Sequence, residues 1–299
     1  MLISGVPGLS SIPNFAPKAT SMEVLTTTKE SMTLQIGLLV ENPTEYSAYI
    51  PFLAVHLEKD GFIIGSASVA NINITPGNNS LIVKATYAPT SNGRGGTKHA
   101  VEKGLELLGE YVSGRDTVLT VKAFEGSIPS LPELSRALSG LGVALPIPRL
   151  QTPPSQHDPD GPPPPEGQPP SKSPFLQGVT MHVFSSTATF LLHNPFPKTP
   201  ITIYNLSGEA IYNDTKLGSV CYDKAWKVLA GREAGKGGVT LSPRLPVGWR
   251  LGSAAFRAML DALGKDLRID ARANATVGVG KWRGRIRFEG GGLRAGIRW

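Results

Sequence analysis

The stretch TLQIGLLVENPT at residues 33–44 carries the clearest fold signal in the chain. Apolar and more polar residues alternate from 33 to 40, which is the two-residue period of a half-buried strand. Asn42-Pro43 then ends the strand, because proline has no N–H to donate to a sheet and restricts the residue before it. The stretch therefore predicts a strand that stops at a turn.

The same sparse pattern returns about 150 residues later, and such self-similarity at a fixed offset indicates a duplicated module. Asn42, Pro43 and Gly65 of the first half correspond to Asn194, Pro195 and Gly218 of the second. We expect these six residues to shape the fold rather than to act in function. Each half continues with a helical stretch and then a β-type run, at 97–112 and 117–124 in the first and at 253–263 and 267–279 in the second.

The length of 299 residues suits two domains. Residues 151–174 contain ten prolines, so they cannot form a core and predict an extended spacer. We expect four segments: a leader at 1–16, interpreted as the tail of a missing preceding domain, a module at 17–150, the spacer at 151–174, and a module at 175–299.

Further strands are predicted at 50–57, 62–70 and 80–87, with a tight turn at 59–61. The helix at 97–112 places Val101, Leu105, Leu108 and Val112 on one apolar stripe. The fold class is therefore mainly β. We predict two tandem antiparallel β-sandwiches, each with one inserted helix that crosses an end of the sandwich.

The sequence carries little that favours an enzyme. The five histidines are not at metal-ligand spacing, and no Gly-x-Ser-x-Gly nucleophile elbow occurs. Cys221 is the only cysteine, which excludes an intrachain disulfide, and we expect its thiol to be buried. We therefore predict a non-catalytic protein without a metal or another cofactor.

The formal charge of +7 is concentrated at the end of the chain, because residues 244–299 hold twelve Lys and Arg against four Asp and Glu. Arg283, Arg285 and Arg287 alternate with less polar residues, as on a strand with one solvated face. The solvated face is the preferred interpretation, and contact with an anionic surface is the alternative. Too few aromatic residues lie among these arginines to favour nucleic acid.

Five Asn-x-Ser/Thr acceptors for N-glycosylation occur, where about one or two are expected by chance. Asn73 and Asn274 fall on the polar side of predicted strands, and Asn78 and Asn213 fall in turns. Strand alternation places Asn205 on the same face as Ile201 and Ile203, which argues against a glycan there. The excess favours a lumenal or extracellular location. The first residues lack the basic and the long apolar region of a signal peptide, and no run approaches the roughly 18–20 apolar residues of a membrane helix. We therefore expect a membrane anchor to lie upstream or to be absent.

The chain resembles late-embryogenesis-abundant type 2 (LEA2), or water-stress-hypersensitive (WHy), domains. The resemblance rests on VENPT at 40–44, GFIIGS at 61–66 and INITPG at 72–77, and on LHNPF at 192–196 in the second copy. It implies Ig/fibronectin III-like β-sandwiches of seven strands with one helix. The tandem copies, together with GVPGL at 5–9, are similar to fungal proteins that hold several Ig-like domains in the vacuolar lumen behind one membrane helix. One member of that family is implicated in the signalling that terminates autophagy.

The first functional hypothesis is a non-catalytic tandem repeat in the lumenal part of a fungal vacuolar-membrane protein, with a protein partner. The second is a module that binds lipid or a membrane surface, because a cleft between sheets can accept apolar ligands. The third is a soluble stress-protective protein in the cytoplasm, which fits the missing signal peptide but not the excess of acceptor sites.

Overall fold

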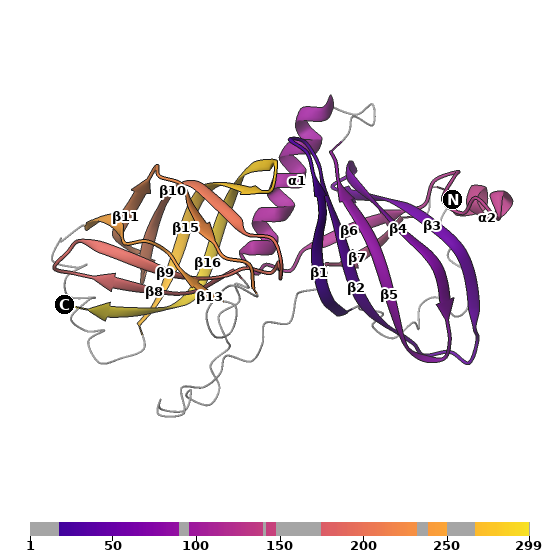
Figure 1. The fold of residues 1–299 in the computed structure, drawn as a ribbon, viewed down its shortest axis with the longest axis horizontal. Coiled ribbons are helices and arrows are strands. Elements are labelled where there is room, and N and C mark those ends of the chain that lie inside the picture. Colours follow the sequence, from indigo (N-terminus) through magenta and orange to yellow (C-terminus); the bar gives the residue numbers. More distant parts are fainter. Residues whose placement is uncertain are drawn as a thin grey trace.

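The structure is a computed structural model that describes residues 18–89, 96–139, 142–147, 175–231, 239–249 and 267–298. Two β-rich modules lie side by side, and helix α1 (Gly96–Val112) stands between them (Figure 1). The predicted leader, the proline spacer and the predicted helix at 253–263 lie outside the described residues.

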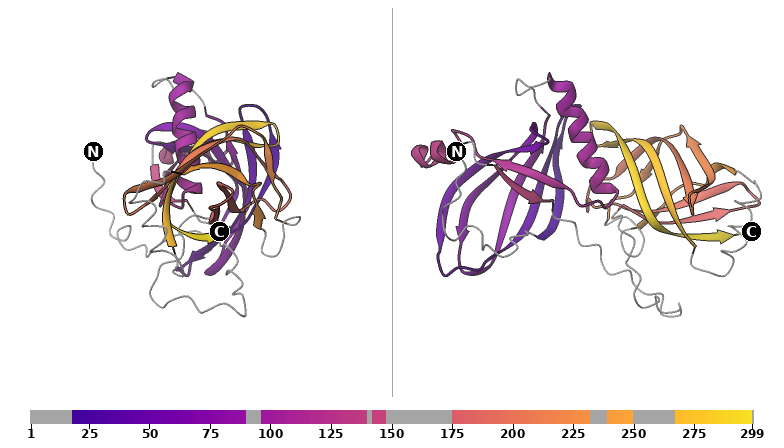
Figure 2. Two further views of the ribbon diagram at one scale, coloured as in Figure 1. Left: turned by 90° about the vertical axis from the view of Figure 1, so that its left-hand side faces the viewer. Right: turned by 180° about the vertical axis from the view of Figure 1, so that it is seen from behind.

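The first module is one antiparallel sheet of seven strands that curls into a half-barrel (Figures 1 and 2). Its strand order is β1-β2-β5-β4-β3-β6-β7, and the two edge strands do not pair with each other among the described residues. The strands are β1 (Lys18–Thr27), β2 (Met32–Asn42), β3 (Ala48–Lys59), β4 (Phe62–Ile74), β5 (Gly77–Tyr87), β6 (Val118–Lys122) and β7 (Gly142–Pro146), and the helices are α1 and α2 (Pro132–Leu138).

The second module is a closed barrel with the strand order β11-β14-β9-β8-β16-β15-β10, in which β10 pairs back onto β11. The β16–β8 pair is parallel and all the other pairs are antiparallel. The main strands are β8 (Leu176–His182), β9 (Thr187–His193), β10 (Ile201–Tyr212), β11 (Thr215–Tyr222), β14 (Leu245–Trp249), β15 (Leu267–Val279) and β16 (Trp282–Arg298). Two short strands, β12 (Trp226–Val228) and β13 (Val239–Leu241), pair with β10 and β9.

The strand orders show the duplication directly. When β1 to β7 are matched in order to β8, β9, β10, β11, β14, β15 and β16, the two sheets have the same sequence of neighbours. They differ at one place, because β8 and β16 pair whereas β1 and β7 do not. The repeated sequence pattern is therefore a repeated topology, closed in the second copy and open in the first.

The predicted sandwiches are wrong, because each module is a single curled sheet and the second sheet is mixed rather than purely antiparallel. Alternation shows only that a strand has one apolar face, and facing sheets or a closed sheet bury such a face equally well. Register shifts interrupt the β3–β4, β10–β11, β10–β15 and β15–β16 pairs. Such bulges bend strands and increase their twist, which favours curling over two flat layers.

Helix α1 begins one residue before the predicted start, but the predicted stripe is only partly correct. Val101 is 38% exposed, whereas Ala100 and Leu107 are buried. Leu105 and Leu108 pack against the core of the second module. The helix therefore buries more than the one stripe expected of a helix that covers a single module.

Three further features differ from expectation or were not predicted. Strand β1 begins just after the predicted leader, and α2 lies in the insertion between β6 and β7. The thiol of Cys221 is exposed rather than buried. No helix in the described parts of the chain is long and apolar enough to cross a membrane.

The junction between the modules combines apolar and polar contacts. The rings of Tyr87 and Trp282 meet edge to face, with centroids 5.8 Å apart. The backbone N–H of Glu289 donates to Ser113 Oγ at 2.9 Å, and that of Lys281 donates to Thr27 Oγ1 at 2.9 Å. These contacts come from the last residues of β1 and β5 and from the residue after α1, and they fix one end of the barrel against the first module.

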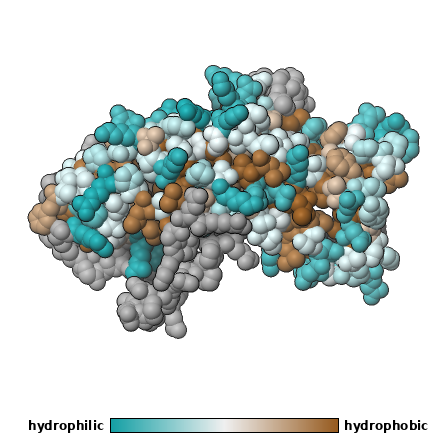
Figure 3. Space-filling model, viewed as in Figure 1, coloured by the Kyte–Doolittle hydropathy of each residue, from teal (hydrophilic) through white to brown (hydrophobic). Residues whose placement is uncertain are grey.

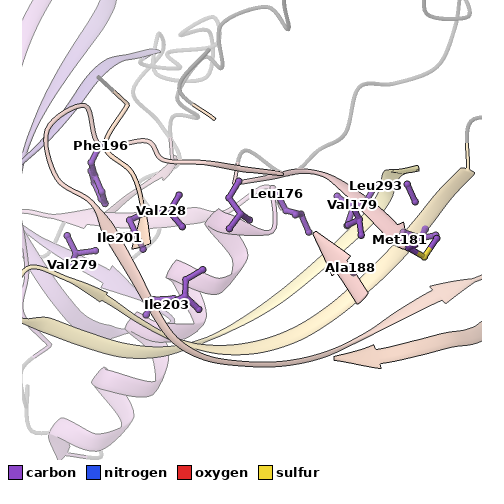
Figure 4. Close-up of a cluster of buried hydrophobic side chains, with 14 of the residues drawn as sticks. Leu176, Val179, Met181, Ala188, Phe196, Ile201, Ile203, Val228, Val279 and Leu293 are labelled. Atoms are coloured by element: carbon purple, nitrogen blue, oxygen red, sulfur yellow. The ribbon is translucent and has the colours of Figure 1, made fainter. Parts of the chain in front are cut away.

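The main buried core fills the second module (Figure 4). Its side chains come from β8, β9, β10, β11, β12, β15, β16 and the loop between β9 and β10, and Met32 of the first module joins them. The least exposed of its large side chains are Met181, Leu217, Ile269 and Leu293, each at 1% or less. The barrel is thus the better packed of the two modules.

Candidate functional site

The inner face of the half-barrel is built from the alternation that defines its strands. Ile36 on β2 pairs with Val83 on β5, and the next inward positions, Leu38 and Leu81, pair in the same way. Side chains directly opposite on neighbouring strands share a face, so the apolar stripe of one strand continues onto the next. The result is a concave apolar surface that crosses the whole sheet.

A cavity of about 660 Å³ lies against this surface and extends into the barrel. Its wall is almost entirely apolar, and the charged or hydroxyl-bearing exceptions are Glu209, Arg272, Ser219, Tyr87 and Tyr111. The wall passes between the modules where Tyr87 contacts Trp282, since both residues line the cavity. Residues of both modules therefore line one apolar cavity.

The two halves of the cavity wall differ in burial. In the barrel, Met181, Ile269 and Val277 are buried. In the half-barrel, most of the wall is only half-buried, as at Ile36 and Val83. Hydrophobic residues also reach the surface over the first module, on the right of Figure 3. The space of the cavity therefore lies mainly along the half-barrel, whereas the most buried of the barrel side chains that line it are closely packed.

Three aromatic residues give the wall limited polarity. Burial raises the pKa of Tyr87 to about 12, so its phenol is neutral at physiological pH. The indole nitrogens Nε1 of Trp226 and Trp249 are buried and have no hydrogen-bond partner among the described residues. Both tryptophans line the cavity. Neither nitrogen has surface accessible to a water-sized molecule, so the two tryptophans present the apolar parts of their rings, and not their N–H groups, to the cavity.

The repeated Asn-Pro motif holds the turn after the second strand of each module. In the first copy, Asn42 Nδ2 donates to the carbonyls of Tyr46 at 2.8 Å and Thr75 at 3.2 Å. Asn194 is 2% exposed. Its Nδ2 lies within hydrogen-bond distance of the carbonyls of Thr199, Val228 and Leu229, at 2.9, 3.3 and 3.0 Å. Its Oδ1 accepts from the N–H of Phe196 at 2.9 Å.

The other members of the repeated motif also lie in structural positions. Pro43 and Pro195 follow the two asparagines, and Pro195 lines the cavity. A Cβ added to Gly65 would collide with the backbone of Thr86, and one added to Gly218 would lie 3.0 Å from the Trp249 side chain. The two glycines allow close contact with a neighbouring strand. None of the six residues forms a reactive group.

All five acceptor asparagines, Asn73, Asn78, Asn205, Asn213 and Asn274, are exposed. Strand alternation predicted that Asn205 points inward with Ile203. The register of the β10–β15 pair, however, shifts between Ile203 and Asn205. This bulge turns Asn205 outward, and its Oδ1 accepts from the N–H of Thr276 at 3.2 Å. Asn205 lies opposite Thr276, and Ser207 lies opposite Asn274, so two acceptor sites are neighbours on the barrel surface.

Arg283, Arg285 and Arg287 are exposed on the outer face of β16, while Ile286 and Phe288 face the cavity. The guanidinium of Arg283 lies over the Tyr204 ring, 4.1 Å from its centroid. Arg287 pairs with Glu289 at 2.6 Å. The structure therefore separates these arginines from the cavity, and their contact with an anionic surface stays a prediction.

The sequence reasoning did not identify the cavity. Its strand alternation named the correct inner face on β2, but it did not show that such faces would surround a space. That space depends on how far the sheet curls, which the local pattern does not encode. Among the described residues, no group of three or more His, Cys, Asp or Glu side chains could hold a metal ion.

Two family models match the chain. Residues 15–136 match the Tag1-like fourth LEA-2 like domain, and residues 168–287 match the Tag1-like fifth LEA-2 like domain. The two ranges correspond to the two modules and lie in the same order as the domain numbers. The comparison with curated proteins gave no match.

Proposed function

Because the chain belongs to the Tag1-like family of proteins with tandem LEA-2-like domains, a non-catalytic type of domain, we propose that its two modules bind a lipid and enclose its acyl chains in their shared cavity. The observation that carries the proposal is the 660 Å³ cavity with its almost wholly apolar wall. Cavities of roughly 300–1,000 Å³ are the usual size for ligand sites.

An acyl chain suits this cavity energetically. Each methylene group moved out of water contributes about 0.8 kcal/mol, so ten methylenes provide about 8 kcal/mol before the loss of freedom on binding is subtracted. Glu209 and Arg272 are the charged residues in the wall, so a strongly charged ligand would lack partners along most of it.

A pair of substitutions on β5 tests the proposal. Val83 is half-buried and lines the cavity, whereas its neighbour Ile82 is 63% exposed on the opposite face. We expect Val83→Glu to weaken binding of a fluorescent long-chain fatty acid at least about tenfold, because a carboxylate would have to be desolvated beside the chain. Ile82→Glu adds the same charge outside and should leave binding unchanged.

Binding is measured by titration of each folded protein and by native mass spectrometry of the complex. Circular dichroism establishes that both variants keep the wild-type secondary structure. If wild type bound no lipid, or if the two glutamates had equal effects on affinity, the cavity would not be the binding site and the proposal would be wrong.

We also propose a location for this activity, namely the lumenal side of a fungal vacuolar membrane, in a protein linked to the signalling that ends autophagy. The exposure of all five acceptor asparagines supports this proposal, because a glycan requires a surface position. The competing proposal is a stress-protective protein in the cytoplasm, where these asparagines would carry no glycan.

Glycosidase treatment of the protein from its native cells distinguishes the two locations. We expect enzymatic removal of N-glycans to increase its electrophoretic mobility, with at most four of the five sites occupied. Asn205 and Asn274 lie diagonally across a strand pair, about 7–8 Å apart, so one glycan would obstruct the second. Unchanged mobility would favour the cytoplasm, and five occupied sites would contradict the crowding argument.

A further inference from the structure

The two modules differ at one strand pair. In the barrel, Ala295, Gly296, Ile297 and Arg298 of β16 pair with 179–182 of β8 and close the ring. The matching strands of the first module, β7 and β1, are the unpaired edges of the half-barrel among the described residues. We call the space between these two edges the β1–β7 slot. The same strand order therefore leaves a lateral opening in one copy only.

The lengths of the last two strands explain the difference. Strands β6 and β7 have five residues each, whereas β15 and β16 have 13 and 17. A tight turn joins β15 to β16, but an insertion that contains α2 separates β6 from β7. Short final strands cannot extend far enough around the sheet to meet β1 along their length.

An exposed apolar residue marks the β7 side of the slot. Val143 on β7 pairs with Val121, a cavity-wall residue, and therefore faces the interior. It is nevertheless 56% exposed. On β1, Met22 also lines the cavity, but it is half-buried and packs against the core of the barrel. If the edge of the half-barrel is open at β7, an apolar side chain on the inner face is expected to be exposed there, as Val143 is.

We propose that the β1–β7 slot is the entrance through which the acyl chain of a lipid reaches the cavity. This inference rests on the lipid binding proposed above and adds the route. The occupant is a chain-shaped apolar molecule, because the cavity continues into the closed barrel, where a folded partner could not follow. Addition of a foreign strand at β7 is disfavoured, since that strand has five residues and ends in Pro146, which has no N–H to donate.

Two exposed valines on neighbouring strands provide a matched test. Val143 faces the slot, whereas Val118 is 50% exposed and lies on the outer face, since the next residue, Leu119, lines the cavity. We expect Val143→Glu to slow both uptake and release of a fluorescent fatty acid about tenfold, because each passing chain must cross a hydrated charge. Equilibrium affinity should stay within about twofold, since the barrier rises equally in both directions. The Val118→Glu variant should take up and release the fatty acid at the wild-type rates.

Stopped-flow transfer from the full chain to phosphatidylcholine vesicles measures release, and mixing with free fatty acid measures uptake. Val143→Trp, which narrows the slot without adding charge, should slow exchange in the same sense. Unchanged rates in both Val143 variants, with lipid still bound, would overturn the entrance and leave the binding proposal intact. A loss of affinity at Val143→Glu that comes from faster release, with unchanged uptake, would also overturn it, because Val143 would then be part of the binding wall. Absence of binding in wild type would instead overturn the binding proposal itself.

Discussion

Replacement of Asn194 by alanine is expected to lower the free energy of unfolding of the second module by about 3 kcal/mol. The Asn194 amide is 2% exposed and bridges the backbone of the β9–β10 loop to the carbonyls of Val228 and Leu229. Alanine would leave those carbonyls and the N–H of Phe196 without these bonds, in a place where water has little access. The loss arises from buried polar groups rather than from removed apolar contact.

The repeat provides the control for this prediction. Asn42 occupies the same place in the first module, but its turn is more exposed and water can replace its hydrogen bonds. We expect Asn42→Ala to cost about 1 kcal/mol. Urea unfolding measures both values, and tryptophan fluorescence reports the second module because all four tryptophans, Trp226, Trp249, Trp282 and Trp299, lie in residues 175–299. Equal losses in the two variants would contradict the argument from burial.

Gly109→Ala is expected to destabilise the contact between the modules by about 2 kcal/mol, although it favours the helix that carries it. A Cβ at position 109 would lie 2.5 Å from the carbonyl oxygen of Arg287. That atom belongs to the β16 backbone, so no side-chain rotation relieves the collision. Alanine nevertheless stabilises a helix interior by about 1 kcal/mol relative to glycine.

The opposite signs make this prediction specific. The midpoint of tryptophan-detected unfolding should fall, whereas hydrogen exchange of the β2 and β5 amides, which reports the first module, should be unchanged or slower. Glu102→Ala, on an exposed part of the same helix, should leave the contact unchanged. Destabilisation of both modules by Gly109→Ala would show that the helix itself had been damaged.

The sequence predicted the elements better than it predicted their assembly. The alternation at 33–40 identified β2, the turn residues placed the β3–β4 hairpin, and the duplicated Asn-Pro motif predicted a shared topology that the strand orders confirm. The prediction was wrong about how each sheet closes on itself. An apolar face is compatible with a sandwich, a half-barrel or a barrel, and the choice depends on bulges and strand lengths far apart in the chain.

Asn205 shows the same limit within one strand. Strict alternation placed it inward with Ile203, but a single bulge reversed its direction. The cavity could not be predicted for a related reason. Each wall residue, such as Val83, reads as an ordinary core position, because the sequence shows that a side chain avoids water but not whether another side chain fills the space beside it.

The position of α1 has a consequence for how arrays of such repeats evolve. The helix is encoded within one copy but packs against the next, through Leu105 and Leu108. Part of the stability of each copy is therefore a nearest-neighbour term, as in solenoid proteins. Gain or loss of a copy would therefore require the new neighbour to offer a compatible docking face for the helix.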